Sequence, residues 1–500
     1  MDLGFNYLTT IVFLPVVGLV IIALLPKPQP RTIKLVALAF TLASFALSLV
    51  VFCLFDRSAG AIGQIQFEEK LSWIPAINAF YHLGVDGLSL PLVILTTFLG
   101  VLAVLVSWKI ELRPKEYFIW LLLLETSILG VFCSLDLVLF FLFWELELIP
   151  MYFLISVWGS GRKEYSAIKY VIYTLVGSAM MLAGILSIYF TTGSLNMMEL
   201  AHLLPITSVK PFIPFAAMFF LLLVGFAIKL PVFPLHTWLP DAHTDAPTAA
   251  SVILAGALLK MGGYGMIRLC VSMFPGVALQ YAPLLVAFAV VSVLYGAAVT
   301  LRQKDLKRLI AYSSVSHMGY VLLGIFALTQ VSLTGATLQM FSHGIITGLL
   351  FAMVGLVYDK THERNLDNLG GLARQMPVIV VVFSIAGLAS LGLPGTSGFA
   401  AEFITFVGSY SSAAFEGIRL CTILGVFGIV LTAGYILWML QRVFYGLPLD
   451  KFKGVPDANN IEKVCIFSFV AAIMLVGIYP AILTNVIKLG VEPIARLVGL

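Results

Sequence analysis

The chain has 500 residues, of which 60% are hydrophobic and only 11% are charged, and its mean hydropathy is +1.04. A soluble domain carries roughly 25% charged residues, so this composition argues against a soluble globular protein and indicates a membrane protein. The formal net charge of +4 is small and the basic residues are scattered over loops, which gives no reason to expect nucleic acid as a partner.

Apolar runs of about 20 residues recur along the chain, and each is long enough to cross about 30 Å of hydrocarbon. The first run, 8–25, has neither a basic segment before it nor a small-residue cleavage site after it, which predicts a retained helix. We predict an all-α fold of about 14 transmembrane helices. The predicted spans are 8–25, 33–53, 84–107, 117–134, 137–157, 165–190, 211–240, 247–271, 281–301, 309–328, 333–357, 376–409, 418–444 and 463–489.

Two of these spans are interrupted. The span 211–240 contains Pro231 and Pro234, and the span 376–409 contains a Pro-Gly pair at 394–395. Proline removes a helical hydrogen bond, so we predict that each span is two half-helices around an unwound middle. Proline kinks are common in transmembrane helices, and the breaks alone do not identify a transporter.

The two breaks lie at corresponding places in two blocks of five spans, 117–271 and 281–444. An odd number of spans places the second block upside down relative to the first, which is typical of the inverted repeats of transporters. The blocks share no close sequence identity. We predict N-terminal flanking helices in 1–116, one repeat in each block, and a C-terminal helix in 445–500.

The basic residues predict the orientation of the chain. Most of the 29 Lys and Arg residues fall in alternate loops on one side, which the positive-inside rule assigns to the cytoplasm, so both termini are expected on the other side. Two lysines, Lys229 and Lys260, fall inside predicted spans instead.

An unpartnered charge inside a span costs at least about 2.5–3.5 kcal/mol. Glu145 lies mid-span among apolar residues, and Lys229 directly precedes the first break, where freed carbonyls and water can solvate an ammonium. A Glu145–Lys229 pair could hold a proton when closed and release it when separated. The alternatives are a protonated Glu145 that only packs, and a static buried ion pair.

Glu147 lies two residues after Glu145, about 200° around the helix, so the two carboxylates cannot share one face. We rank Glu147 lower, because it can equally contact a neighbouring helix or subunit. Glu125, in the preceding span, and Asp136, after the end of that span, are weaker candidates for part of a half-channel.

Later spans add further ionisable residues. Histidine titrates near neutral pH, which suits a relay, although each histidine alone is more often a hydrogen-bonded interior residue. Proton conduction needs such groups at intervals that one or two waters can bridge, whereas a substrate transporter gathers its polar groups in one pocket. The candidates, one in each of six spans, are Glu145, Lys229, Lys260, His317, His343 and Glu402.

The sequence predicts neither a metal site nor a cofactor in this chain. The cysteines form no CxxC pair, and a polar cluster at 236–245 imitates metal ligands but has proline spacing that fits no regular metal site. A structural polar loop is the favoured interpretation of that cluster. Its members are His236, Asp241, His243 and Asp245, and the five cysteines are Cys53, Cys133, Cys270, Cys421 and Cys465.

Several of these strings resemble the proton-translocating, antiporter-like subunits of respiratory complex I, over almost the whole chain. The resemblance implies two inverted five-helix repeats with flanking helices. It also implies a switch carboxylate at Glu145 with Lys229 as its partner, a central relay at Lys260 and an exit group at Glu402. The strings are Phe143-Trp144-Glu145, 148–152, Lys229-Leu230-Pro231, 234–243, 246–249, 307–319 and Leu393-Pro394-Gly395.

Within that family the L-type subunit has a lysine at the terminal position and a long C-terminal lateral helix, whereas this chain has Glu402 and ends soon after its last span, which favours the M type. The run 144–150 is also similar to the D subunit of the photosynthetic-type complex, which leaves the electron donor and the quinone open. The resemblance implies FMN, iron–sulfur clusters and quinone in partner subunits, L-type and N-type neighbours, and a bacterial plasma membrane or thylakoid membrane.

Two other interpretations remain open at this point. The chain could be a subunit of an Mrp-type cation/proton antiporter or of a membrane-bound hydrogenase, whose related subunits share the Glu–Lys core. It could also be a structural anchor between neighbouring subunits, in which case replacing Lys229 or Glu145 would leave pumping intact.

Overall fold

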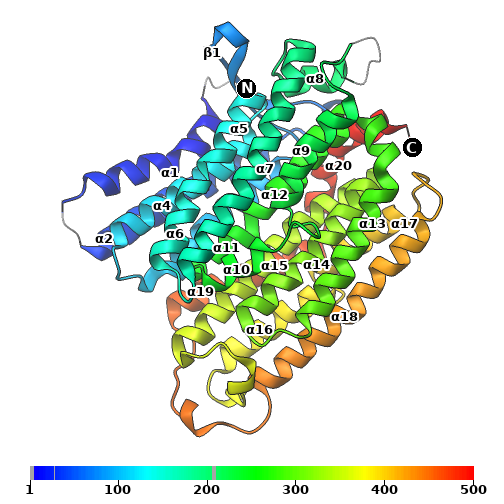
Figure 1. The fold of residues 1–500 in the computed structure, drawn as a ribbon. Coiled ribbons are helices and arrows are strands. Elements are labelled where there is room, and N and C mark those ends of the chain that lie inside the picture. The colour runs from blue at the N-terminus through cyan, green and yellow to red at the C-terminus, as the bar shows by residue number, and fades with distance from the viewer. Residues whose placement is uncertain (1–4, 27–28, 205–209, 500) are drawn as a thin grey trace.

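The computed structural model describes residues 5–26, 29–204 and 210–499, which form one bundle of helices with a small β-hairpin at one end (Figure 1). Twelve helical segments of the described chain are long and apolar enough to cross a membrane, and Phe215–Lys229 and Pro377–Ser390 are shorter apolar helices. The helices are α1 Tyr7–Leu24, α2 Pro30–Leu54, α3 Leu90–Val106, α4 Pro114–Cys133, α5 Leu137–Leu146, α6 Leu148–Trp158, α7 Lys163–Thr192, α8 Met197–Leu203, α9 Phe215–Lys229, α10 Trp238–Asp245, α11 Thr248–Ile253, α12 Leu259–Gly265, α13 Pro275–Thr300, α14 Leu306–Phe326, α15 Gln330–Thr361, α16 Pro377–Ser390, α17 Ser397–Tyr410, α18 Ile418–Phe444, α19 Asn460–Ile478 and α20 Ala481–Val498, and the strands are β1 Gln66–Ile74 and β2 Ala79–Val85.

Both predicted helix interruptions are present. The chain leaves helical geometry between α9 and α10 and again between α16 and α17. Because Pro231 has no N–H, the carbonyl of Ala227 accepts from Val232 at 2.9 Å, and the carbonyl of Ile228 accepts from the Trp238 indole at 2.9 Å. The first break therefore keeps these freed carbonyls hydrogen-bonded without continuing the helix.

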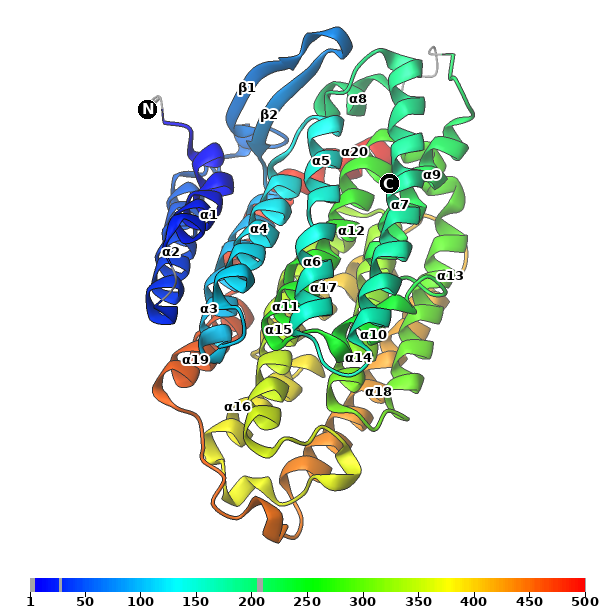
Figure 2. The same cartoon turned by 60° about the vertical axis from the view of Figure 1, so that its left-hand side comes forward.

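Two matching loop contacts occur at opposite ends of the bundle (Figure 2). Asp136 caps α5 and forms a single β-bridge to Asn196, while Asp305 caps α14 and forms the same bridge to Asn365. In each pair the asparagine follows the aspartate by the same number of residues. This correspondence is what two inverted repeats over 117–271 and 281–444 would produce.

The β-hairpin was not predicted from the sequence, and it fixes the beginning of α1. Glu69 of β1 accepts hydrogen bonds from the backbone N–H groups of Leu8 at 2.8 Å and Thr9 at 3.0 Å. The Thr9 hydroxyl also lies 2.7 Å from the Tyr81 hydroxyl of β2. A carboxylate at this position satisfies donors that the first turn of a helix leaves free.

Glu69→Ala is expected to lower the stability of the protein by about 1 kcal/mol, the usual cost of losing a helix cap. The measurement is thermal unfolding of the purified protein in detergent, compared with the unmodified chain. Lys70→Ala is the matched control on the same strand, and it should change stability by less than about 0.5 kcal/mol. Equal effects of the two substitutions would contradict the capping role.

The predicted last span, 463–489, is present as α19, but its predicted end is wrong. Helix α19 ends at Ile478, and after Pro480 the chain turns into a separate helix, α20. Helix α20 has polar residues such as Lys488 and Arg496 on its exposed face and apolar residues on the buried one, so it is amphipathic rather than apolar all round. The predicted start of the third span at 84 is also too early, because residues 79–85 form β2.

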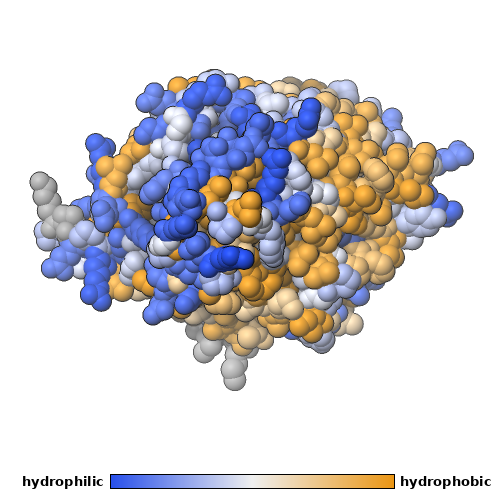
Figure 3. Space-filling view, turned by 90° about the horizontal axis from the view of Figure 1, so that it is seen from below, coloured by the Kyte–Doolittle hydropathy of each residue, from blue (hydrophilic) through white to orange (hydrophobic). Residues whose placement is uncertain are grey.

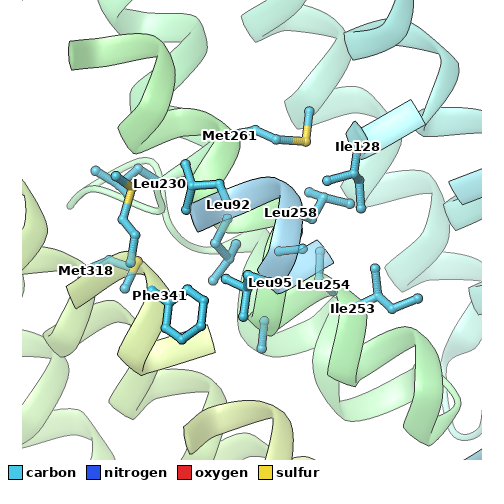
Figure 4. Packing of buried hydrophobic residues seen from close by; sticks show 14 of the residues in the cluster. Leu92, Leu95, Ile128, Leu230, Ile253, Leu254, Leu258, Met261, Met318 and Phe341 are labelled. Carbon is cyan, nitrogen blue, oxygen red and sulfur yellow. The ribbon is translucent and has the colours of Figure 1, made fainter. Parts of the chain in front are cut away.

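The helix pair α11–α12 forms the centre of the bundle, and all 18 residues of its most apolar window are buried. Two π-helical segments, Leu254–Leu258 and Met266–Val271, flank α12. Figure 4 shows side chains from several helices packed around the first of these segments: Leu92, Leu95, Ile128, Leu230, Ile253, Leu254, Leu258, Met261, Met318 and Phe341.

The end of the bundle opposite the hairpin carries many hydrophilic side chains, whereas hydrophobic side chains dominate the flank on the right of that view (Figure 3). Membrane-length helices expose large apolar residues, for example Ile172 on α7 and Val430 on α18. An apolar flank between polar ends is the surface expected of a protein that spans a bilayer.

Candidate functional site

The first cluster of buried ionisable residues forms beside the break after α9. The ammonium of Lys229, the last residue of α9, donates to Glu147 Oε1 and to the Tyr170 hydroxyl, the latter at 3.2 Å. The Tyr170 hydroxyl in turn donates to Glu147 Oε2 at 2.5 Å. Lys229 also lies 5.7 Å from the ring centroid of Trp144 and 5.2 Å from that of Tyr170. The lysine is thus held by a carboxylate, a hydroxyl and two aromatic faces.

The carboxylate that contacts Lys229 in the structure is Glu147, and not the predicted partner Glu145. Glu145 lies on the same helix face as the exposed residues Leu142 and Ile149, and it is only half-buried. Its Oε1 atom is buried without a hydrogen-bond partner, near Ser178 of α7. Glu147 occupies the one-residue turn between α5 and α6, which directs its side chain to α9.

Lys260 lies at the centre of the bundle, on α12 between the two π-helical segments, and is fully buried. Its ammonium donates to the carbonyl of Ala255, within the first π-helical segment, and lies 2.9 Å from His343 Nδ1. π-Helical turns are rare and occur frequently at functional sites. The sequence did not predict them, and the glycines at 262 and 263 are the nearest signal of unusual packing there.

The second cluster continues from Lys260 through two histidines to Glu402. The rings of His343 and His317 have centroids 5.6 Å apart. His317 Nδ1 lies 3.3 Å from Glu402 Oε1, and His317 Nε2 lies 3.2 Å from the hydroxyl of Ser390, the last residue of α16. Four of the predicted residues therefore form one continuous series, which ends at the second helix break.

A small cavity of about 10 Å³ lies among these residues, and this is about the volume needed to hold one water molecule. Its walls include His317, His343, Gln339 and Glu402. The Glu402 carboxylate lies under Gly392 in the loop between α16 and α17, where a Cβ atom would come within 2.9 Å of Glu402 Oε2. Such a polar space can hold water that connects the side chains.

The two clusters do not touch. No hydrogen bond joins Lys229 to Lys260 in the part of the chain that the structure describes. Helix α12 instead packs directly on the first break: a Cβ atom on Gly262 would lie 2.6 Å from the Phe226 carbonyl oxygen and 2.7 Å from the Leu230 nitrogen. Closely packed backbone of α12 and of the end of α9 therefore lies between the two clusters.

The weaker candidates have separate surroundings. Glu125 of α4 is buried against Gly100 of α3, and its Oε1 atom has no hydrogen-bond partner. Asp136 caps α5 and accepts from the Phe80 N–H of the hairpin at 3.0 Å. Burial raises the pKa of Asp136, while its backbone hydrogen bonds oppose that shift. Asp136 thus caps α5 and also holds the hairpin against it.

The four polar residues at 236–245 contact separate partners and do not converge on one site. Asp241 pairs with Lys169 at 2.6 Å, and Asp245 accepts from Ser166 at 2.6 Å. His236 stacks on Phe233, and His243 stacks on Phe351 with ring centroids 4.5 Å apart. These contacts hold α10 against α7 and α15.

Tyr170 is the site residue that sequence reasoning missed. A tyrosine in an apolar helix carries no charge and is common in membrane proteins, so nothing in the sequence distinguishes it from its neighbours. Only the folded structure shows that α7 places it 2.5 Å from Glu147 and 3.2 Å from Lys229.

The fold and these clusters define a polytopic helical membrane protein with ionisable residues arranged through its interior. Residues 134–432 match the model of a family described as NADH:quinone oxidoreductase/Mrp antiporter, transmembrane region, and the chain belongs to this family.

Relatives match the chain over nearly its full length. It is 41% identical to NAD(P)H-quinone oxidoreductase chain 4 2 of Thermosynechococcus vestitus, covering 99% of this chain and 93% of the relative. It is 40% identical to NADH-quinone oxidoreductase subunit M of Rhodobacter capsulatus, covering 96% and 95%. A chain of respiratory complex I from Thermus thermophilus superposes with a TM-score of 0.87 at 29% identity, covering 98% of this chain and all of that one.

Proposed function

We propose that the chain is the M-type, proton-translocating membrane-arm subunit of an NADH-quinone or ferredoxin–plastoquinone oxidoreductase. The observation that carries the proposal is the continuous series from Lys260 through His343 and His317 to Glu402, together with the Lys229–Glu147 pair. Groups that can hold a proton follow one another there at distances that a hydrogen bond or one water can bridge.

In the proposed mechanism the Lys229–Glu147 pair acts as a switch. While the pair is closed, the carboxylate and Tyr170 stabilise the ammonium of Lys229. When the pair opens, a desolvated lysine without its counter-charge gives up its proton more readily. Lys260 and the two histidines then relay a proton to Glu402, the proposed exit group beside the second break.

The same proposal extends to the surroundings of the chain. Its partners would be the other membrane-arm subunits, including L-type and N-type antiporter-like subunits. FMN, iron–sulfur clusters and quinone would be in partner subunits, with no redox chemistry in this chain. The protein is integral to a membrane, which we propose is a bacterial plasma membrane or a thylakoid membrane, with both termini on the non-cytoplasmic side.

A subunit of an Mrp-type antiporter is the second candidate, since the family description covers both classes. The relatives that match this chain at about 40% identity over nearly its whole length carry oxidoreductase names, which favours the first candidate. A purely structural anchor is the third interpretation, and the intact buried series argues against it.

Glu147→Gln is expected to reduce proton pumping at least about tenfold in vesicles, because a neutral amide cannot act as the counter-charge that Lys229 requires. Pumping and quinone reduction are measured together, with assembly checked by native gel. Glu145→Gln is the matched comparison two residues away. The geometry predicts a smaller loss for it, whereas the switch role implied by the family resemblance predicts an equal one.

The two variants together test the proposed function. If Glu147→Gln loses proton pumping and Glu145→Gln loses less, the switch is assigned to Glu147. If both variants lose pumping equally, both carboxylates are assigned to the pathway. If both variants assemble and pump at the unmodified level, the proposed function is wrong and the anchor interpretation replaces it.

A further inference from the structure

An apolar groove of about 560 Å³ opens on the flank of the bundle, between α2, α3, α15, α19 and α20. Its aromatic walls are Phe45, Phe52, Phe98 and Phe341. Ser468 is the lining residue with a polar side chain, and its hydroxyl donates to the Val464 carbonyl of its own helix at 2.8 Å. The groove therefore offers an occupant little besides apolar contact, at a volume typical of sites for small molecules.

The groove reaches the end of the bundle that carries the β-hairpin. Its α2 residues precede the C-terminus of α2, and its α19 and α20 residues adjoin the turn between those two helices. Just beyond α2, the Arg57 guanidinium lies 4.5 Å from the ring centroid of Phe52 and donates to the Phe52 carbonyl at 3.0 Å. An exposed cation therefore stands at the polar rim of an apolar groove.

We propose that this groove binds one acyl chain of an anionic phospholipid, with the lipid phosphate held by Arg57. Water does not fill an apolar cavity of this kind, and hydrocarbon at this depth of a membrane comes from lipid tails. A guanidinium presents paired N–H donors that match a phosphate, so the rim selects an anionic headgroup. The inner wall at Phe341 belongs to the same turn of α15 as His343.

The test uses the assembled complex in vesicles of phosphatidylglycerol that carries a photoactivatable group near the end of one acyl chain. Illumination is expected to label peptides of α3, α15 and α19 that line the groove, several-fold more than the exposed face of α18. The same probe built on phosphatidylcholine is expected to label the groove less, because the zwitterionic headgroup is bound less well by Arg57.

Arg57→Gln should reduce labelling by the phosphatidylglycerol probe to the phosphatidylcholine level. Arg419→Gln, another exposed arginine stacked on an aromatic ring, is the matched control and should leave labelling unchanged. Ala472→Phe should fill the groove and remove labelling in complexes that still assemble. Since Arg57 lies in an exposed loop, its variant tests the proposal even if the filled variant does not assemble.

Three outcomes would overturn the proposal. The first is equal labelling of the groove and of α18, which would show ordinary contact with bulk lipid. The second is an unchanged preference for phosphatidylglycerol in Arg57→Gln. The third is cross-linking of the groove residues to a segment of a neighbouring subunit, which would show that protein occupies the groove. None of these outcomes depends on proton pumping.

Discussion

Replacing Lys229 by alanine is expected to abolish proton pumping and to slow quinone reduction at least about tenfold in a complex that still assembles. The substitution leaves Glu147 buried with Tyr170 as its remaining partner, and removing one member of a buried ion pair costs about 3–5 kcal/mol when the other stays charged. The variant therefore lacks the ion pair that the proposed switch opens and closes. Pumping and quinone reduction are measured in the same vesicles.

Two further substitutions separate charge from proton release. Lys229→Arg keeps a cation beside Glu147, but a guanidinium does not give up its proton under physiological conditions, so this variant should assemble well and still fail to pump. Lys169→Ala, which removes a partly exposed lysine that pairs with Asp241, is the control and should keep most of the activity. Normal pumping by Lys229→Arg would contradict a role in proton release.

Replacing Lys260 by methionine is the second change for which we expect a large effect. Methionine has a similar length and suits an apolar interior, so the variant should fold, but it cannot carry a proton between the Lys229 cluster and His343. Proton pumping is expected to fall below about one tenth of its normal value, in step with quinone reduction. The measurement is the same paired assay, with assembly confirmed by native gel.

Lys304→Met provides the matched control, because Lys304 forms an exposed ion pair with Asp367 at 2.7 Å and lies outside the buried series. That variant should pump normally. If Lys260→Met assembles and pumps like Lys304→Met, protons do not pass through the centre of the bundle, and the relay from Lys260 to Glu402 has to be abandoned.

The series from Lys260 to Glu402 could be predicted because a charged residue inside an apolar run is conspicuous, and each of its members stands in a separate span. The two helix breaks could be predicted for a similar reason, since proline cannot continue a hydrogen-bonded helix. Both features follow from the local sequence, because a charge or a proline inside an apolar run can be identified without knowing the fold, and a buried charge is costly enough to require a reason.

The partner of Lys229 could not be predicted, because Glu145 and Glu147 are only two residues apart. Which of them faces α9 depends on the turn between α5 and α6. Pro150 marks that turn, because it has no N–H to donate to the Leu146 carbonyl, but it does not indicate which carboxylate points to α9. Tyr170 was missed because its contacts join distant parts of the chain. The β-hairpin was missed because β1 mixes charged and apolar residues without the regular alternation that predicts a strand. Helix α20 was merged with α19 because its apolar face continues the hydrophobic run beyond Pro480.

The contact between Gly262 and the first break links the two clusters mechanically. The missing side chain lets the α12 backbone rest against the last turn of α9, at the Phe226 carbonyl and the Leu230 N–H, directly before the break. If the break moves when the Lys229–Glu147 pair opens, it pushes on the helix that carries Lys260 two residues earlier. Opening of the Lys229–Glu147 site would then displace the backbone that carries Lys260 before any proton has moved between the two clusters.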